Sequence, residues 1–148
     1  MTETASAQSS QQYSMVLKPL LDIPKVRHVV VASSDGIVKV ASADLHKDRA
    51  DGVAAMSSAA LSAVRAATND AVQDDPQKPV DNPIETITTT TALGTLMIMP
   101  AGDNAFLVVV GERDMPMGLV AGTAARQARR LGEKLMSIPA RDTGGKPS

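Results

Sequence analysis

The stretch VRHVVVASSDGIVKVAS, residues 26–42, decides the fold. Its first half, Val26 to Ser33, is rich in β-branched valine and apolar on both faces, which predicts a strand buried on two sides. Ser34-Asp35-Gly36 follows, and Asp-Gly between apolar runs indicates a tight hairpin turn, because glycine accepts the positive φ that such a turn needs. Ile37 to Ser42 is the returning strand. The segment therefore predicts an antiparallel hairpin that needs cover on both faces.

Helical periodicity flanks this hairpin. Met15 to Leu21 is predicted to be a short helix, because the proline of Ile23-Pro24 forces its preceding residue out of the helical conformation. From Asp48 to Ala71 the apolar period changes to that of a long helix, with Asp44 or Asp48 as its cap. The stripe that we expect this helix to bury consists of Val53, Met56, Ala60, Val64, Ala67 and Ala71.

Another face of the long helix carries almost only small side chains, Ala55, Ala59, Ser62 and Ala66. Two interpretations stay open at this point. Alanine is the best helix former, so the face needs no function. Alternatively, small side chains let a second helix approach closely.

The second half of the chain begins with a loop, residues 73–84, that contains three prolines. A Thr-rich strand, two more apolar strands and a closing helix follow, with the predicted bounds Glu85–Ala92, Gly94–Ala101, Ala105–Glu112 and Pro116–Met136.

The predicted order is thus α-β-β-α-β-β-β-α. Short hairpins make the strands antiparallel, and strands that are apolar on both faces need helices above and below. We expect an α+β fold, an α/β/α sandwich, with a five-stranded antiparallel sheet, the middle helix on one face and the terminal helices on the other. Residues 14–138 are predicted to form this domain, whereas residues 1–13 and 139–148 are predicted to be a disordered arm and tail.

Composition excludes several classes of function. The chain has 148 residues, no Cys, two His, one Tyr and one Phe, and 15 basic against 16 acidic residues. A net charge of −1 and so few aromatic residues disfavour nucleic-acid binding. No apolar run is long enough to insert into a membrane and no signal peptide is apparent, so we expect a cytoplasmic protein.

Motifs for catalysis or metal binding are missing. The sequence contains no P-loop, dinucleotide-binding, nucleophile-elbow, zinc-protease or EF-hand pattern. His28 and His46 are not at ligand spacing, so we expect no metal, no cofactor and no catalytic residue. The cluster Arg126, Arg129, Arg130 and Lys134 on the closing helix has two interpretations: a patch for a phosphate, an anionic lipid or an acidic partner, or, as we favour, a solvated face near the negative end of the helix dipole.

The order of these elements resembles the roadblock/dynein light-chain family. The resemblance rests on the hairpin of residues 26–42 with its Ser-x-Asp-Gly at Ser33–Gly36, the Ala-rich helix, the three-strand meander and the closing helix LVAGTAARQARRLGEKL. It covers about Met15 to Met136. The sequence is most similar to bacterial roadblock proteins encoded beside a small Ras-like GTPase and a sensor kinase, the conservon type. It departs from the family in the long Pro-rich loop of residues 73–84.

The resemblance implies a non-enzymatic regulator that homodimerises and binds a small Ras-like GTPase, modulating its nucleotide state. It leaves room for a sensor kinase as a further partner and for peripheral association with a membrane through partners. In such dimers the third strands pair edge to edge and the middle helices pack together. The dimer interface that this implies consists of Ala55, Ala59, Ser62, Ala66, Thr86, Ile87, Thr88, Thr89 and Thr90.

Residues on the remaining face of the middle helix are candidates for contact with the GTPase, namely Arg49, Asp51, Ser58, Arg65 and Asn69. Arg49 and Arg65 are named by location alone, and neither is assigned as an arginine finger. The alternative function is a small-molecule-sensing module, because related sandwich folds open a cavity between sheet and helix. The aliphatic core and the lack of convergent polar groups argue against it.

Overall fold

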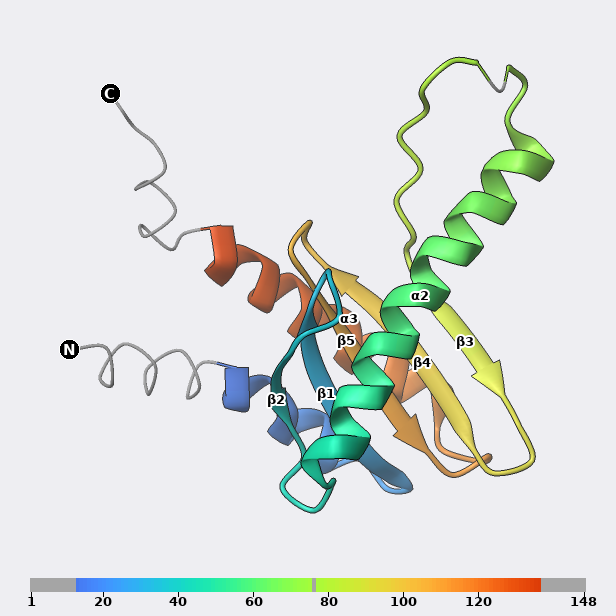
Figure 1. Cartoon of the computed structure of the whole chain (residues 1–148). Helices are drawn as coiled ribbons and strands as arrows, with labels where there is room; N and C mark the ends of the chain where they lie inside the picture. The colour runs from blue at the N-terminus through green and yellow to red at the C-terminus, as the bar shows by residue number, and fades with distance from the viewer. Residues whose placement is uncertain (1–12, 76, 137–148) are drawn as a thin grey trace, which may run out of the picture.

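The protein folds around one five-stranded antiparallel sheet, described in a computed structural model for residues 13–75 and 77–136. The strand order is β2-β1-β5-β4-β3, so β1 and β5 lie towards the centre and β2 and β3 at the edges (Figure 1). The elements are a helix at residues 13–21, β1 (Val26–Ser33), β2 (Val38–Ala41), α2 (Lys47–Val72), β3 (Ile87–Thr90), β4 (Thr95–Ala101), β5 (Ala105–Gly111) and α3 (Met117–Met136).

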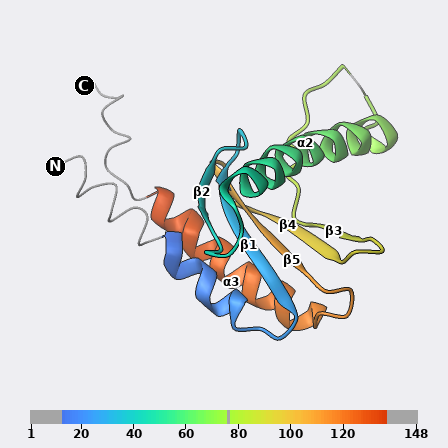
Figure 2. The same cartoon turned by 60° about the horizontal axis from the view of Figure 1, so that its bottom comes forward.

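Helices cover both faces of the sheet, as predicted. Figure 2 shows α2 on one face and the helix of residues 13–21 beside α3 on the other. Alternate residues of β1 supply the two cores: Val29 and Val31 pack under α3, whereas Val30 and Ala32 pack under α2. Phe106 is buried in the core under α2. The predicted α/β/α sandwich and element order are therefore confirmed.

Some boundaries differ from the predictions by a few residues. β3 begins at Ile87 and ends at Thr90, inside the predicted range 85–92, because the extended residues before Ile87 do not pair with β4. The predicted arm and tail fall mainly on residues 1–12 and 137–148, which lie outside the described residues. Tyr13 already belongs to the first helix.

The long helix α2 differs from its prediction in its cap and in its buried face. His46, and neither Asp44 nor Asp48, is the N-cap: its Nδ1 accepts a hydrogen bond from the Asp48 amide over 3.1 Å. The residues that α2 buries are Ala50, Ala54, Ser57 and Leu61. Of the predicted stripe, Val53 and Ala60 are partly buried at its flank, whereas Met56, Val64, Ala67 and Ala71 are exposed.

Two causes account for the difference: the buried face is turned by roughly a quarter of a turn from the predicted stripe, which exposes Met56, and α2 outruns the sheet. At about 1.5 Å per residue, its 26 residues span about 39 Å. Leu61 is the last buried residue, and the part of α2 beyond it projects past the end of the sheet together with the loop that returns to β3 (Figure 1). A helix that leaves the sheet halfway has no core to bury the second half of its apolar stripe.

A pair of glycine substitutions tests this packing. A Cβ at Gly111, where β5 ends, would lie 2.6 Å from the carbonyl oxygen of Lys25 and would also meet the Met115 sulfur. Because the Lys25 oxygen is held by the Glu112 amide, Gly111→Ala should lower the free energy of unfolding by about 1–3 kcal/mol. Gly52 in α2 has open space around it, so Gly52→Ala should raise that free energy by about 0.5–1 kcal/mol. Urea unfolding of both variants measures the two effects, and equal effects would contradict the close approach at Gly111.

Candidate protein-interaction surface

The two edges of the sheet differ in how open they are to another strand. β2 forms one edge, and its pairing with β1 contains a register shift between Val31 and Ala32, next to the exposed Lys39. Bulges and edge lysines both hinder edge-to-edge pairing of sheets. β3 forms the other edge, pairs with β4 without a shift, and contains no charged residue and no proline. The open edge of this sheet is therefore β3.

The backbone groups of β3 alternate between β4 and the open side. The Thr91 amide donates to the Gly94 carbonyl over 2.7 Å, and the Gly94 amide donates to the Thr91 carbonyl over 3.3 Å, which closes the hairpin. Every second residue of an antiparallel ladder exchanges such bonds with its opposite. Thr89 and Ile87 therefore bond to β4, whereas the N–H and C=O groups of Thr88 and Thr90 point away from it. These outward groups are the ones that an added strand would use.

An apolar face of α2 lies exposed on the same side of the molecule as β3. Val53 and Ala60 pack against the core that includes Ile87 and Leu96, so this flank of the helix faces the β3 side. Residues three or four positions along share that flank: Met56 is 75% exposed and Val64 is 42% exposed. The exposed α2 face consists of Met56, Ala59, Ala63, Val64, Ala66 and Ala67.

The residues predicted for a dimer interface fall into two places. Thr86 to Thr90 lie at the open β3 edge, where Thr86 donates to the Ile98 carbonyl over 3.3 Å. Ala59 and Ala66 belong to the exposed α2 face. Ala55 also lines the groove beside Gly36 and Ile37 of the β1–β2 turn, and Ser62 lines the crevice near Ser34 and Asp103. Ala55 and Ser62 precede Ala59 and Ala66 by four residues, so all four side chains belong to one exposed stripe of α2.

Most of the residues predicted to face a GTPase are tied to other parts of the chain. Ser58 donates to the Ser34 carbonyl over 3.0 Å, and Arg65 Nε donates to the Asn82 carbonyl over 3.1 Å. The Asn69 side chain accepts from Asn82 Nδ2 over 2.9 Å, so Arg65 and Asn69 together fix the loop before β3 against α2. Asp51 pairs with Lys47 within α2. Among these five candidates, Arg49 alone combines exposure with a side chain that forms no hydrogen bond or ion pair to another described residue.

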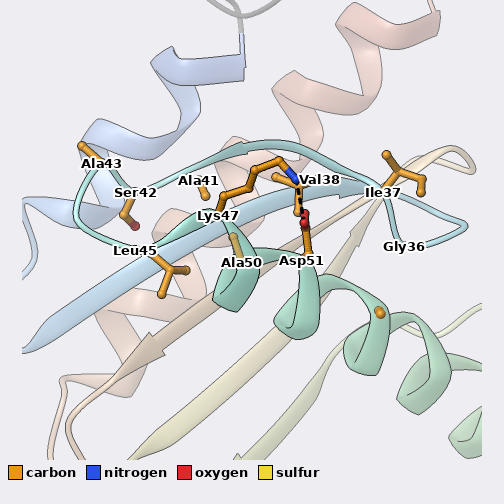
Figure 3. Close-up of a pocket in the computed structure, with 11 residues that line it drawn as sticks. Gly36, Ile37, Val38, Ala41, Ser42, Ala43, Leu45, Lys47, Ala50 and Asp51 are labelled. Atoms are coloured by element: carbon orange, nitrogen blue, oxygen red, sulfur yellow. Dashed lines mark hydrogen bonds and ion pairs between the residues drawn. The ribbon is translucent and has the colours of Figure 1, made fainter.

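A groove separates β2 from the beginning of α2 (Figure 3). It has a volume of about 750 Å³ and is lined mainly by Gly36, Ile37, Val38, Ala41, Ala43, Leu45, Ala50 and Ala55. Its polar groups already have partners: the buried Ser42 hydroxyl bonds to the Val29 backbone, and Lys47 pairs with Asp51 over 2.8 Å. The hydrogen bond and charge of Asp51 raise the pKa of Lys47. The groove thus offers apolar surface and no convergent free polar groups.

The residues at 13–75 and 77–136 contain no group of three or more His, Asp or Glu placed to hold a metal ion. None of the helices there combines the length and the apolar character that crossing a bilayer requires. What the surface presents is an open strand edge beside an exposed apolar helix face.

The sequence pattern contains the signal for this helix face but predicts it to lie in the core. Met56 and Val64 have the spacing of a buried stripe. The length of α2 relative to the strands accounts for Val64, which comes after Leu61, whereas Met56 is exposed because α2 turns Ala54, Ser57 and Leu61 towards the sheet.

Comparisons with known proteins agree with this architecture. No curated protein matches the sequence. A solved Roadblock/LC7 domain from Streptomyces avermitilis is 22% identical, with a TM-score of 0.69 over 84% of this chain and 94% of that chain. The gliding protein MglB from Thermus thermophilus is 16% identical, with a TM-score of 0.70 over 88% of this chain and 92% of that chain. MglB from Myxococcus xanthus is 14% identical, with a TM-score of 0.72 over 86% of this chain and 90% of that chain.

These structures share the fold, and the family itself follows from the sequence. The model of the Roadblock/LC7 domain matches residues 13–111, which include the helix of residues 13–21, α2 and all five strands. This match spans well over half of the chain. The chain therefore belongs to the Roadblock/LC7 family.

Proposed function

We propose that this protein is a non-enzymatic regulatory scaffold that homodimerises and binds a small Ras-like GTPase, modulating its nucleotide state. The observation that carries the proposal is that the open β3 edge and the exposed apolar face of α2 lie on the same side of the domain. A second copy related by a two-fold axis can cover both at once. The resemblance to roadblock proteins encoded beside small GTPases is the reason for proposing a Ras-like GTPase as the partner.

Each of these two surfaces has groups without partners in a single copy, and a second copy supplies the partners. The outward N–H and C=O groups of Thr88 and Thr90 find partners when a second β3 pairs with them antiparallel, giving a continuous ten-stranded sheet. Met56 and Val64 lose contact with water when a second α2 lies beside the first. An isologous contact places each surface against itself, and threonine edges and small helix side chains are both self-complementary. One solved MglB is described as having a tetrameric arrangement, which fits a fold that self-associates.

The GTPase is proposed to bind where the paired helices face outward. In such a dimer the two α2 helices lie side by side, and the exposed Arg49 lies near the beginning of each. A protein surface that works by contact needs no catalytic group of its own. The small-molecule alternative ranks second, because the polar groups of the groove between β2 and α2 are already paired with each other or with the backbone.

Proline at position 88 tests the β3 contact without disturbing the domain. The Thr88 amide points away from β4, so Thr88→Pro removes no hydrogen bond within the protomer but blocks a strand from pairing there. Sedimentation equilibrium of this variant should give the mass of one chain, 15.4 kDa, with an unchanged circular dichroism spectrum.

Thr88→Val is the matched control, since it keeps the amide and the β-branched shape. It should sediment with twice the mass of one chain, as the unmodified protein should. A Thr88→Pro protein that still forms the dimer would move the interface away from β3.

Charged substitutions on α2 test which face of the helix lies at the dimer interface. Met56→Arg and Val64→Arg place a charge in the exposed α2 face and should each raise the dimer dissociation constant about a hundredfold, or about 2.7 kcal/mol. Ala55→Arg lies beside the β1–β2 turn and should leave the dimer intact. If Ala55→Arg breaks the dimer and Val64→Arg does not, the helix contact lies on the opposite flank.

Arg49→Ala tests the placement of the GTPase. Its loss should weaken binding of a nucleotide-loaded Ras-like GTPase about tenfold, the scale of one charged contact. Lys39→Ala removes the same charge from the β2 edge of the sheet and serves as the control. Titration against the GDP-loaded and GTP-analogue-loaded forms measures both affinities, and hydrolysis with and without the protein measures regulation. A chain that binds no such GTPase in either state would refute the proposed function.

A further inference from the structure

A net charge of −1 conceals a separation of charge between the projecting end of α2 and the outer face of α3. The projecting part of α2 and the loop after it carry five carboxylates, Asp70, Asp74, Asp75, Asp81 and Glu85, against Lys78 and, nearer the sheet, Arg65. All five carboxylates are exposed, and none forms an ion pair with another described residue. We call this projection, residues 68–75 and 77–85, the acidic arm.

The acidic arm ends in an apolar groove. The groove has a volume of about 440 Å³ and lies between the end of α2 and the returning loop; its lining includes Val72 and Val80, the carboxylates of Asp74 and Asp75, and one cation, Lys78. Val72 is 71% exposed and Val80 is 52% exposed. Two valines held open to water beside carboxylates are suited to an occupant with an apolar side chain next to cations.

The carboxylates of the acidic arm lie at the negative end of the α2 helix dipole, where negative charge is unfavourable. The last turn of α2 contains no basic residue, although the C-terminal end of a helix favours cations. Asp70, Asp74 and Asp75 add negative charge where the dipole is already negative. A cationic partner would remove this repulsion, whereas no ion pair within the described protomer does.

The outer face of α3 carries the complementary groups. Leu119, Arg126 and Arg130 follow one another at helical spacing, Leu119 is 52% exposed, and the neighbouring Arg129 is also exposed. Arg126 donates to the Thr123 hydroxyl over 3.2 Å, while none of the three arginines has a carboxylate partner among the described side chains. Glu133 is the one acid on this face, which we call the basic face.

We propose that the acidic arm of one copy docks on the basic face of α3 of another copy, with Arg129 and Arg130 beside Asp74 and Asp75. The two surfaces lie on opposite faces of one sheet, so they cannot meet within a protomer (Figures 1 and 2). A second copy is the occupant because the same chain supplies both charges and both apolar groups. The contact is heterologous, and it leaves β3 free, so it links dimers into larger rings or chains.

Ionic strength is the first test. At about 0.01 M salt the Debye length is about 30 Å, and sedimentation velocity of the full chain should show species larger than a dimer; at about 1 M salt, where it is about 3 Å, these should dissociate. A chain with the same mass at both salt concentrations overturns the proposal. Thr88→Pro should keep the salt-dependent association, because β3 takes no part. Loss of the dimer at high salt therefore bears on the proposed function only.

Complementation is the sharper test. Asp74→Lys with Asp75→Lys removes the acidic rim, and Arg129→Glu with Arg130→Glu removes the opposing cations; each protein alone should lose the large species at low salt. Mixing the two should restore them, because one variant keeps an intact basic face and the other an intact arm. The affected side chains are exposed, and thermal unfolding verifies that both variants fold.

Failure of the mixture to assemble, or assembly by either variant alone, overturns the proposal. Vesicles of phosphatidylserine and phosphatidylcholine provide the competing outcome. If the unmodified chain binds them through Arg129 and Arg130 and forms no large species, the basic face docks on membranes and the proposed contact is wrong.

Discussion

The pairing of β1 with β5 is the constraint on which the rest of the structure depends. The two strands pair from Val26 to Ser33, and most of the valines of both strands are buried, on both faces of the sheet. A central pair of this kind cannot face water on either side, so helices must lie above and below it. The chain meets this demand with few large side chains: Phe106 is the one phenylalanine, and the cores are otherwise built mostly from aliphatic residues.

The helices cover the two faces of the sheet to different extents. On one face, α3 and the helix of residues 13–21 lie over the sheet together, and Leu20, Val120 and Leu131 are completely or almost completely buried. On the other face a single helix must cover five strands, and α2 buries only Ala50, Ala54, Ser57 and Leu61 before it leaves the sheet. The core beside β3 stays partly open, with Ile87 and Leu96 half-buried. Incomplete cover on this one face leaves the β3 side available as the interaction surface that we propose.

The fold could be predicted from the sequence because its signals are local. The valine run and Asp35-Gly36 identify the first hairpin, and the change of period identifies α2. The buried face of α2 could not be predicted in the same way, since alanine occurs on nearly every side of this helix and the apolar stripe continues past the sheet. The cap was also missed, because a histidine accepting from the amide two residues later replaces the acidic side chain expected there. The bulge that hinders strand pairing at β2 depends on how β2 pairs with β1, and no residue type in the sequence indicates it.

Because the side chains on these surfaces are small, their shape contributes little to the choice of partner. A large aromatic anchor selects its pocket by shape, but a threonine edge and an alanine face fit many flat surfaces equally well. Discrimination then has to come from the backbone edge and from charge. The bulge and Lys39 close β2 to strand pairing while β3 stays open, and carboxylates at the end of α2 repel like-charged surfaces. A protein with almost no aromatic residues can in this way keep its contacts specific, with the strand edge defining one interface and opposite charges on the two faces of the sheet defining another.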